Sequence, residues 1–495
     1  MLPILLAPWL IPPQGGASPS LVPLLFSLAG MGLMLSCTPL LVRGVTRTEL
    51  AAVIAGAWLT AAVVSSVIGL FQYFGVAHFN VLMSPAEAGE AYGNLRQRNQ
   101  FATLTNIGLM AAIWWVARPS GSHPYRGQPW ILHGAAILLG IGNAASLSRT
   151  GLMQLLLIAG MVVLWSASNE RVRRVLLTVL FAYALAAWAL PMLRGQESGA
   201  GNIYSRFQPV GDVCTSRLTL WRNVWSLVEQ RPWRGWGWGE LDFAHFIAVY
   251  DGTRFCDILD NAHNLPLQLA VELGLPFAAL ICSVFAGLIW RAQPWREKDW
   301  NRRLAWGGVA LLLLHSMVEY PLWYGPFQMA LALCLGLLLW PESESIEQKV
   351  AGKMQQRTSY WLMIIGGSLL VTSAYAAWDY YRVSQIFYPP DLRAAAYREN
   401  TLEKIRGTWL FQDQVQFAEF TLTPLTSANA AYLYEMGQRV LHYSPEARVV
   451  EKLIECAVLL GKDEAGRFYL ARYKAAFPKE HARWAAKQLE PGKPQ

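Results

Sequence analysis

The stretch LAAVIAGAWLTAAVVSSVIGL, residues 50–70, decides the fold class. It carries no charged side chain, and it is about as long as the roughly 20 apolar residues that an α-helix needs to cross a bilayer. The apolar start of the chain, residues 1–11, lacks the basic residues of a secretory signal, so we count it as a further span. Nine more apolar windows occur, at 21–42, 101–117, 131–146, 152–166, 175–193, 265–290, 304–318, 325–340 and 360–378. The sequence therefore predicts an all-α polytopic membrane protein with about eleven transmembrane helices.

The composition agrees with this fold class. Hydrophobic residues make up 54% of the 495-residue chain and charged residues only 15%, against about 25% charged residues in soluble domains. The 22 tryptophans also fit, because indole rings favour the headgroup level of a membrane.

Basic residues on short connections predict the orientation in the membrane. They occur on alternate connections, which the positive-inside rule assigns to the cytoplasm, so residues 71–100, 194–264, 315–324 and everything after about 380 are expected on the outer face. The net charge of +8 is mostly this topology signal and argues little for a nucleic-acid partner. The basic residues concerned are Arg43, Arg47, Arg118, Arg126, Arg171, Arg173, Arg174, Arg291, Arg296, Lys298, Arg302 and Arg303.

Four regions follow from these patterns. We expect an N-terminal transmembrane bundle (1–193), a large outer loop with an amphipathic helix (194–264), further transmembrane helices (265–380) and a helical outer domain (381–495). In the last region small and aromatic residues recur at helical spacing, and Pro445 and Pro478 lie close to one 34-residue tetratricopeptide period apart. We therefore expect a tetratricopeptide-like domain, whose role is partner docking, covering of the outer face, or packing alone.

The outer loop holds the stretch CTSRLTLWRNVWSLVEQRP, residues 214–232. Leu218, Trp221, Trp225 and Val228 recur at the spacing of one helical face, after Ser216 as a plausible cap and before Pro232. Such a helix would lie at the outer leaflet with its tryptophans toward lipid. Cys214 and Cys256 share this loop and can form a disulfide in an oxidising compartment, although spacing alone leaves free thiols equally open.

Several arginines of the predicted outer face indicate an anionic ligand. Arg217 would lie in the first turn of the amphipathic helix, where backbone N–H groups and a guanidinium together bind phosphate well; a contact to lipid headgroups is the alternative. Arg149, in the short turn SLSRTG, needs an anionic partner at membrane depth. Arg96 and Arg98 precede another span in the same way. Together they suggest a phosphorylated lipid.

His263 stands directly before a predicted helix that Asn264 can cap and Pro266 can begin. The positive end of the helix dipole disfavours a charged imidazole there, and a neutral ring is what a general base needs. Asp260 or Asp257 could orient the ring, while a plain headgroup contact is the alternative reading. A Cys214–Cys256 disulfide would hold His263 and Arg217 together as one site.

A second pair is His315 and Glu319, four residues apart and therefore expected on one helical face at the outer end of a span. Ionisable residues of opposite character at such a place are typical of function, although a structural pair between two helices fits as well. No Asp-x-Asp, no histidine pair with metal-ligand spacing, no dinucleotide fingerprint, no phosphate-binding glycine–lysine loop and no nucleophile elbow occurs in the sequence. We therefore predict no metal and no cofactor.

Four stretches together resemble a known group of proteins. SRLTLWRNVWSLVEQRPWRGWGWGELDF (216–243) and AHNLPLQLAVELGLP (262–276) resemble the signature of the Wzy/O-antigen ligase superfamily of bacterial inner-membrane glycan transferases. YGNLRQRNQFATL (92–104) and HSMVEYPLWY (315–324) are similar to its protein O-oligosaccharyltransferases of the PglL/PilO type, the protein glycosylation ligases. The resemblance covers most of residues 90–340.

The resemblance implies a GT-C-like, metal-independent enzyme of the bacterial inner membrane with its active site on the periplasmic side. It would transfer a preassembled glycan from undecaprenyl pyrophosphate to Ser or Thr of pilin-like or other exported proteins. O-antigen ligases use a lipid A core sugar as acceptor and polymerases another repeat unit, and both activities stay open. A transporter of the same lipid is the alternative of another class, but the sequence lacks the matching halves such proteins carry.

Carried over to this sequence, the resemblance makes His263 the base and assigns Arg217 and Arg149 to the pyrophosphate. Arg98 and Gln100 depart from the family pattern, which has proline and histidine at these positions. The residues expected to support the site are Arg96, Gln97, Asn99, Asp260, His315, Glu319 and Tyr324.

Overall fold

The computed structural model describes residues 2–12, 18, 20–76, 82–95, 97–118, 129–166, 169–195, 213–340 and 348–489. Every regular element in these ranges is a helix. The chain divides into two compact units, the first made of Met1–Val210 and Leu288–Ala377 and the second of Gly211–Gly287 and Trp378–Gln495. Each unit is described separately below. The all-α class that the sequence predicts is confirmed.

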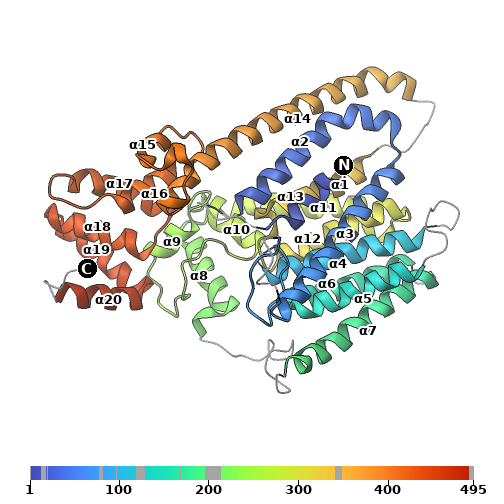
Figure 1. Ribbon diagram of the computed structural model, residues 1–495, viewed down its shortest axis with the longest axis horizontal. Coiled ribbons are helices and arrows are strands. Elements are labelled where there is room, and N and C mark those ends of the chain that lie inside the picture. Colours follow the sequence, from blue (N-terminus) through green and yellow to red (C-terminus); the bar gives the residue numbers. More distant parts are fainter. Residues whose placement is uncertain are drawn as a thin grey trace. The chain divides into compact units, whose positions relative to one another are not determined.

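The first unit is a bundle of apolar helices that run side by side (Figure 1). Helix α4 is its centre, because it contacts α3, α5, α6, α7 and α12, and every residue from Gln100 to Trp114 is buried. The helices of the bundle are α1 (Leu2–Leu10), α2 (Leu21–Gly44), α3 (Arg47–Tyr73), α4 (Arg98–Ala117), α5 (Pro129–Ala145), α6 (Arg149–Ser166), α7 (Glu170–Leu193), α12 (Trp300–Ser316), α13 (Gly325–Leu339) and most of α14 (Gln348–Ser384).

Small residues allow these helices to approach closely, as is common in membrane bundles. A side chain added at Gly108 of α4 would come within 2.3 Å of Ala62 in α3. A side chain added at Gly142 of α5 would come within 2.6 Å of Ser66 in α3. Glycine at these positions is therefore a packing requirement of the bundle.

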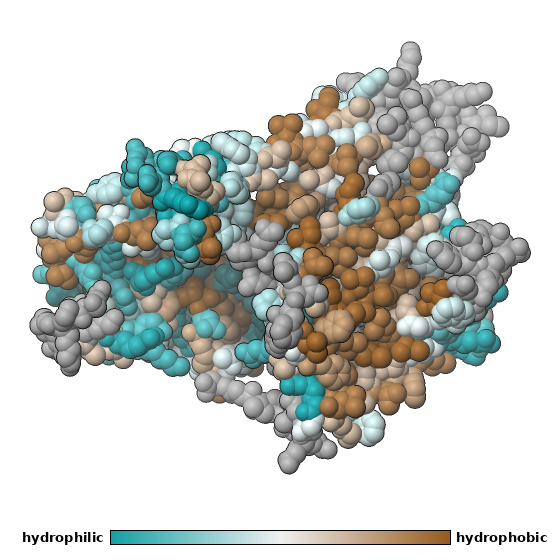
Figure 2. Space-filling model, in the orientation of Figure 1, coloured by the Kyte–Doolittle hydropathy of each residue, from teal (hydrophilic) through white to brown (hydrophobic). Residues whose placement is uncertain are grey.

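Six helices in the described ranges are long and apolar enough to cross a membrane, and three shorter ones are also apolar. Figure 2 shows the corresponding apolar surface over the bundle. The protein is a multi-pass helical membrane protein, and the more exact count of about eleven spans remains a prediction. The six candidate spans are Leu21–Thr38, Arg47–Tyr73, Arg98–Ala117, Glu170–Leu193, Leu275–Arg296 and Tyr360–Phe387.

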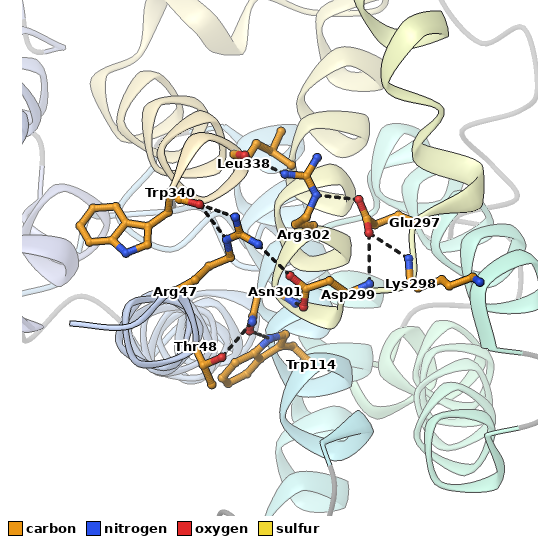
Figure 3. Close-up of polar contacts among 10 residues, drawn as sticks. All are labelled: Arg47, Thr48, Trp114, Glu297, Lys298, Asp299, Asn301, Arg302, Leu338 and Trp340. Carbon is orange, nitrogen blue, oxygen red and sulfur yellow. Dashed lines mark hydrogen bonds and ion pairs between the residues drawn. The ribbon is translucent and has the colours of Figure 1, made fainter. Parts of the chain in front are cut away.

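One end of the bundle is fastened by arginines that bind helix-terminal carbonyls (Figure 3). Arg47, the first residue of α3, donates from Nε to the Trp340 carbonyl at 3.0 Å and from Nη1 to Asp299 at 3.4 Å. Arg302 of α12 donates to the Leu338 carbonyl at 2.7 Å and also pairs with Glu297. The carbonyls at a helix C-terminus have no partner within the helix, and these arginines supply one.

The same end contains an uncharged link between three helices (Figure 3). Asn301 accepts from the Trp114 indole at 3.1 Å and donates to the Thr48 hydroxyl at 3.0 Å, while Asp299 caps α12 by accepting from the Asn301 backbone. Helices α3 and α12 therefore begin where α4 and α13 end. Basic residues gather at this end, as expected for the side that the sequence assigns to the cytoplasm.

The second unit combines the outer loop with the C-terminal helices (Figure 1). Helices α16 to α20 contact one another in chain order, and Phe246 of α9 is buried in their apolar core. The expected helical C-terminal region is confirmed, whereas its tetratricopeptide-like character stays a prediction. The helices are α8 (Arg217–Gln230), α9 (Leu241–Ile247), α10 (Leu265–Leu273), most of α11 (Leu275–Ala292), the end of α14, α15 (Thr401–Ile405), α16 (Gln412–Leu422), α17 (Ala430–Tyr443), α18 (Ala447–Leu459), α19 (Asp463–Ala476) and α20 (Pro478–Leu489).

The window 265–290 was expected to form one transmembrane helix. This expectation is wrong, because the window is divided between α10 and α11. It breaks at Gly274, where φ is +86° and a side chain would come within 2.4 Å of the Trp233 carbonyl. Leu275 also donates its backbone N–H to the Pro232 carbonyl. The backbone of Pro232 and Trp233 therefore lies against the chain at Gly274, between the end of α10 and the start of α11.

Candidate active site

A disulfide joins the two cysteines of the outer loop. Cys214 and Cys256 are bonded with their Cα atoms 5.2 Å apart, which resolves the alternative that the sequence left open. Asn223 of α8 fastens the same segment, because its side chain donates to the Thr253 carbonyl at 3.0 Å and accepts from the Phe255 backbone at 2.7 Å. The chain that leads to His263 is thus held against α8.

Helix α8 begins and ends where the sequence predicts. Ser216 is its cap and accepts from the Thr219 backbone at 3.1 Å. Leu218 and Trp225 are exposed as expected, but Val228 is buried. The series expected to face lipid was therefore wrong at Val228. This residue lies on the buried face of α8 with Leu220, in the core of the second unit.

The backbone at His263 is strained and tightly held. Its φ is +50°, a region that residues other than glycine rarely occupy, and its N–H donates to the Asn261 side chain at 2.8 Å. Ala262, directly before it, accepts from the Trp221 indole at 3.1 Å and donates to Gln268 at 2.6 Å. Strain of this kind persists only when its surroundings impose it, and it is common at functional sites.

His263 lies directly ahead of a helix N-terminus, as predicted. Asn264 caps α10 by accepting from the Leu267 backbone at 3.0 Å, and Pro266 occupies the first turn. Arg217 is the first residue of α8, so both predicted residues stand at helix N-termini, which favour anions. The orientation of the His263 ring by Asp257 or Asp260 stays a prediction.

An apolar groove adjoins this point within the second unit. Its volume is about 680 Å³. Trp221 and Trp225 of α8 form one wall, and Leu267 and Ala270 of α10 face them together with the start of α11. Polar groups enter only at a few places, among them Asn264 beside His263. A long apolar ligand with a polar head fits such a lining.

Acidic residues of the outer loop lie close to one another. Burial, together with the neighbouring charges of Glu240 and Asp260, raises the pKa of Asp242 to about 7. Glu240 pairs with His442 of α17, Oε2 to Nδ1 at 2.7 Å. A carboxyl group that titrates near neutral pH is typical of functional sites.

The other histidine of the loop has a structural role. His245 is buried, with its Nδ1 2.6 Å from the Tyr250 hydroxyl, and Arg254 donates to its carbonyl at 2.7 Å. Burial, followed by the charge of Arg254, lowers the pKa of His245 to about 3. This histidine therefore stays neutral and secures the end of α9.

In the first unit, Asn99 joins three of the predicted stretches. Its Nδ2 donates to Glu319 at 3.0 Å, and its Oδ1 accepts from the Ser148 hydroxyl at 2.6 Å. Ser148 also accepts from the Gly151 backbone at 2.9 Å and so caps α6. Arg149 is the exposed first residue of that helix. The chain from Glu319 through Asn99 to Ser148 therefore fixes the helix end that presents Arg149.

His315 and Glu319 lie one helical turn apart, because the Glu319 backbone N–H donates to the His315 carbonyl at 2.9 Å. Helix α12 ends at Ser316, and Glu319 lies beyond it. His315 is fully buried, with Nδ1 2.9 Å from the Thr103 hydroxyl, whereas Glu319 binds Asn99. The two residues are linked through α4, which makes them part of the structural network around that helix.

The remaining predicted residues lie at the same end of the bundle. Gln97 donates to the Tyr320 hydroxyl at 3.5 Å, and the Tyr320 ring stacks on that of Tyr324, with centroids 5.7 Å apart. Arg98 pairs with Glu90, so its charge has a partner within the chain. Arg96 lies outside the described residues.

Two buried glutamines were missed by the sequence analysis. Gln72 of α3 donates to the carbonyls of Ser84 and Gly93 and accepts from the backbones of Tyr92 and Gly93. Gln154 of α6 donates to the Leu311 carbonyl and accepts from Thr103. For Gln154, the available signal was a lone polar residue inside the apolar window 152–166. Gln72 lies just beyond the window 50–70 and binds the start of the YGNLRQRNQF stretch at Tyr92 and Gly93.

Arg217 and His263 belong to the second unit, and Arg149, Asn99 and Glu319 to the first. Their convergence around one ligand therefore stays a prediction. Over the described residues, no group of three histidine, cysteine or acidic side chains is arranged to hold a metal ion.

Comparison with known proteins identifies related families. The O-antigen ligase family model matches residues 134–282, the protein glycosylation ligase model residues 91–116, and the C-terminal model of the virulence factor membrane-bound polymerases residues 303–490. No solved structure matches the chain.

Two curated relatives come from Acinetobacter baylyi. A general O-oligosaccharyltransferase is 22% identical over 311 residues, which are 60% of this chain and 51% of the relative. A ComP-specific O-oligosaccharyltransferase is 24% identical over 285 residues, 57% of this chain and 50% of the relative. The chain thus spans about half the length of the curated relatives it matches. On these matches, the chain is similar to the Wzy/O-antigen ligase superfamily and, within it, to the PglL-type protein O-oligosaccharyltransferases.

Proposed function

We propose that this protein is an O-oligosaccharyltransferase. It moves a preassembled glycan from undecaprenyl pyrophosphate to Ser or Thr hydroxyls of exported, pilin-like proteins. The observation that carries the proposal is the placement of His263, which is held in a strained backbone conformation directly before Asn264, a residue that lines an apolar groove. The names of the two curated relatives support the same reaction class.

The groove suits the tail of a polyprenyl donor. Its walls are formed by Trp221, Trp225, Leu267 and Ala270, and an isoprenoid chain offers the apolar surface that such walls bind. The charged head of the donor would then lie toward Asn264 and the adjoining His263. Arg217, at the N-terminus of α8, would bind the pyrophosphate, because the guanidinium and the helix dipole both favour an anion there.

In the proposed reaction, the acceptor hydroxyl oxygen bonds to the anomeric carbon of the glycan. The bond from that carbon to the pyrophosphate oxygen breaks, and its electron pair leaves with undecaprenyl pyrophosphate. His263 takes the hydroxyl proton as general base, while Arg217 and Arg149 stabilise the charge on the departing pyrophosphate. We further propose that the enzyme is GT-C-like and needs no metal.

The location is part of the same proposal. The enzyme would lie in the bacterial inner membrane with about eleven spans and its active site on the periplasmic side. The basic residues around Arg47 and Arg302 support this orientation, because they gather at the opposite end of the bundle from Asn99 and Glu319. The helical C-terminal region, tetratricopeptide-like in this proposal, would receive the acceptor protein.

A second candidate is O-antigen ligase or polymerase activity with the same donor. The matches to the O-antigen ligase model and to the virulence factor polymerase model favour it. The two candidates differ in the acceptor alone. In the native host, loss of the gene should remove the glycan from exported pilin-like proteins by intact-mass analysis and leave lipopolysaccharide unchanged by blotting; the reverse pattern would favour the ligase.

The test of the catalytic assignment is complementation of that deletion strain. His263→Asn is the sharpest variant, because asparagine tolerates a positive φ better than alanine and has no basic ring nitrogen. We expect it to abolish detectable glycosylation, and Arg217→Ala to reduce it by roughly 10²–10³. Arg234→Ala, an exposed arginine of the same loop, is the matched control and should behave as wild type. Full glycosylation by His263→Asn at wild-type protein levels would refute the assignment.

A further inference from the structure

A turn far along the chain returns to the end of α14 and presents two apolar side chains outward. Helix α14 ends at Ser384, yet residues 408–410 lie against it again. Trp409 is 70% exposed, and Leu410 beside it is exposed as well. The turn therefore presents apolar surface at a fixed position of the fold.

Asp379 holds this turn in place. The residue is 0% exposed, and its Oδ2 accepts from the Thr408 hydroxyl at 2.7 Å and from the backbones of Trp409 and Leu410 at 3.2 and 3.3 Å. Its Oδ1 accepts from Arg382 at 2.9 Å. Four donors satisfy the buried carboxylate, as burial of a charge requires. The outward direction of Trp409 is therefore imposed by the fold.

The end of α14 and the segment that follows it expose side chains typical of a membrane interface. Trp378 and Tyr381 of α14, Phe387 and Leu392 are all exposed, Leu392 to 68%. The guanidinium of Arg382 lies 4.4 Å from the centre of the Trp378 ring. Tryptophan and tyrosine with arginine beside them are enriched at the headgroup level of membranes, where the aromatic ring is half in lipid and the cation in water.

Helix α14 is also a candidate membrane span. The span covers Tyr360–Phe387, and only 11% of its most apolar 18-residue window is buried. Ile364 and Val371 are among its exposed side chains. Trp378 follows them at the same seven-residue interval on the helix, and the neighbouring Asp379 binds the 408–410 turn.

We propose that Trp409 and Leu410, with Trp378, Tyr381, Phe387 and Leu392, form an interfacial anchor that inserts into the lipid headgroup layer. The occupant of this surface is the bilayer, because the surface continues the exposed side of a membrane span and combines aromatic rings with an arginine. An exported protein or a second copy of the chain would be the other possible occupants. The anchor gives the helical region that follows α14 a second attachment to the membrane, in addition to the helix itself. This role does not depend on the reaction proposed above.

The test uses the full-length protein in lipid nanodiscs. Leu410→Cys and Leu392→Cys are each spin-labelled in a background where the free cysteines Cys37, Cys282, Cys334 and Cys456 are replaced and the disulfide is kept. Power-saturation measurements compare collisions with oxygen, which concentrates in lipid, against a water-soluble nickel complex. Val458→Cys, also apolar and exposed but on α18, is the matched control. We expect an oxygen-to-nickel ratio several-fold higher at 410 and 392 than at 458.

Asp379→Asn provides the second variant. It weakens the hold on the turn, so the label at 410 should lose its lipid signature while a label at Tyr381→Cys, on the helix itself, keeps it. Nickel accessibility at 410 and 392 equal to that at 458, in nanodiscs that hold one folded protein each, would overturn the proposal. Protection of these sites that appears only on adding an exported protein, or only in dimers, would also overturn it.

Discussion

Removing the disulfide of the outer loop should lower stability by an amount that follows from the chain length it encloses. The perturbation is the double variant Cys214→Ser, Cys256→Ser. The two residues are separated by 42 positions, and closing a loop of that size removes chain entropy from the unfolded state worth about 4 kcal/mol. For a unit of 150–250 residues each kcal/mol shifts Tm by roughly 2–4 °C, so the double variant should unfold about 8–16 °C lower.

The folded loop should keep its arrangement in this variant. Asn223 and Trp221 still bind the segment 253–262 through three hydrogen bonds. The loss should therefore appear in thermal unfolding and not in the glycan transfer that we propose, when transfer is measured well below the melting range.

Intrinsic tryptophan fluorescence of the purified protein during heating is the assay, because Trp221, Trp225 and Trp236 report on α8 and its surroundings. Cys37→Ser, which removes a free cysteine of α2, is the control and should leave Tm unchanged. Reductant should lower Tm of the wild type and not of the double variant. A double variant that unfolds within 2 °C of a wild type whose disulfide is intact by mass spectrometry would refute the loop-entropy reasoning.

Three further predictions concern the two units separately. Asn99→Ala should destabilise the bundle by about 1–3 kcal/mol, because Glu319 and Ser148 each lose a hydrogen bond; thermal unfolding equal to wild type would contradict the network. Arg302→Ala should cost about 1–3 kcal/mol by removing the donor to the Leu338 carbonyl, and Arg302→Lys should recover little of it, since lysine lacks the planar fork that serves two acceptors; full recovery would show that charge alone matters. Burial raises the pKa of Asp242 to about 7, so its stabilising protonated form is fully present below about pH 4 and is lost as pH rises toward 7 and above. Tm of the wild type should therefore fall between pH 5 and 8 more steeply than that of Asp242→Asn, and parallel slopes would contradict the burial.

Local signals of the sequence predicted the parts of the site that depend on neighbouring residues. Ser216 and Asn264 as helix caps, with Pro266 in the first turn of α10, follow from the unpaired backbone N–H groups at a helix start. The sequence showed that Cys214 and Cys256 share one loop. Their spacing could not show that the two chain segments come close together. The structure supplied that approach through Asn223.

Features that depend on distant segments escaped the sequence analysis. The break at Gly274 exists because the Trp233 carbonyl comes within reach of that position, and Trp233 is far away in the sequence. Gln154 lies inside the apolar window 152–166 and Gln72 just after the window 50–70, so the role of their polar side chains could not be seen until their partners on α4 and the 82–95 segment were known. The sequence placed Glu319 one turn after His315, but it could not show that both side chains bind α4, at Asn99 and Thr103.

Turnover of the purified protein tests the central claim most directly. Wild type and His263→Asn are given undecaprenyl-pyrophosphate-linked oligosaccharide and a pilin-like acceptor in the same nanodisc preparation, and the rate of glycan addition is followed by intact-mass analysis. If His263 accepts the hydroxyl proton beside the lipid groove, the variant should be slower by about 10²–10⁴ at unchanged Tm. A rate within a few-fold of wild type would contradict the account.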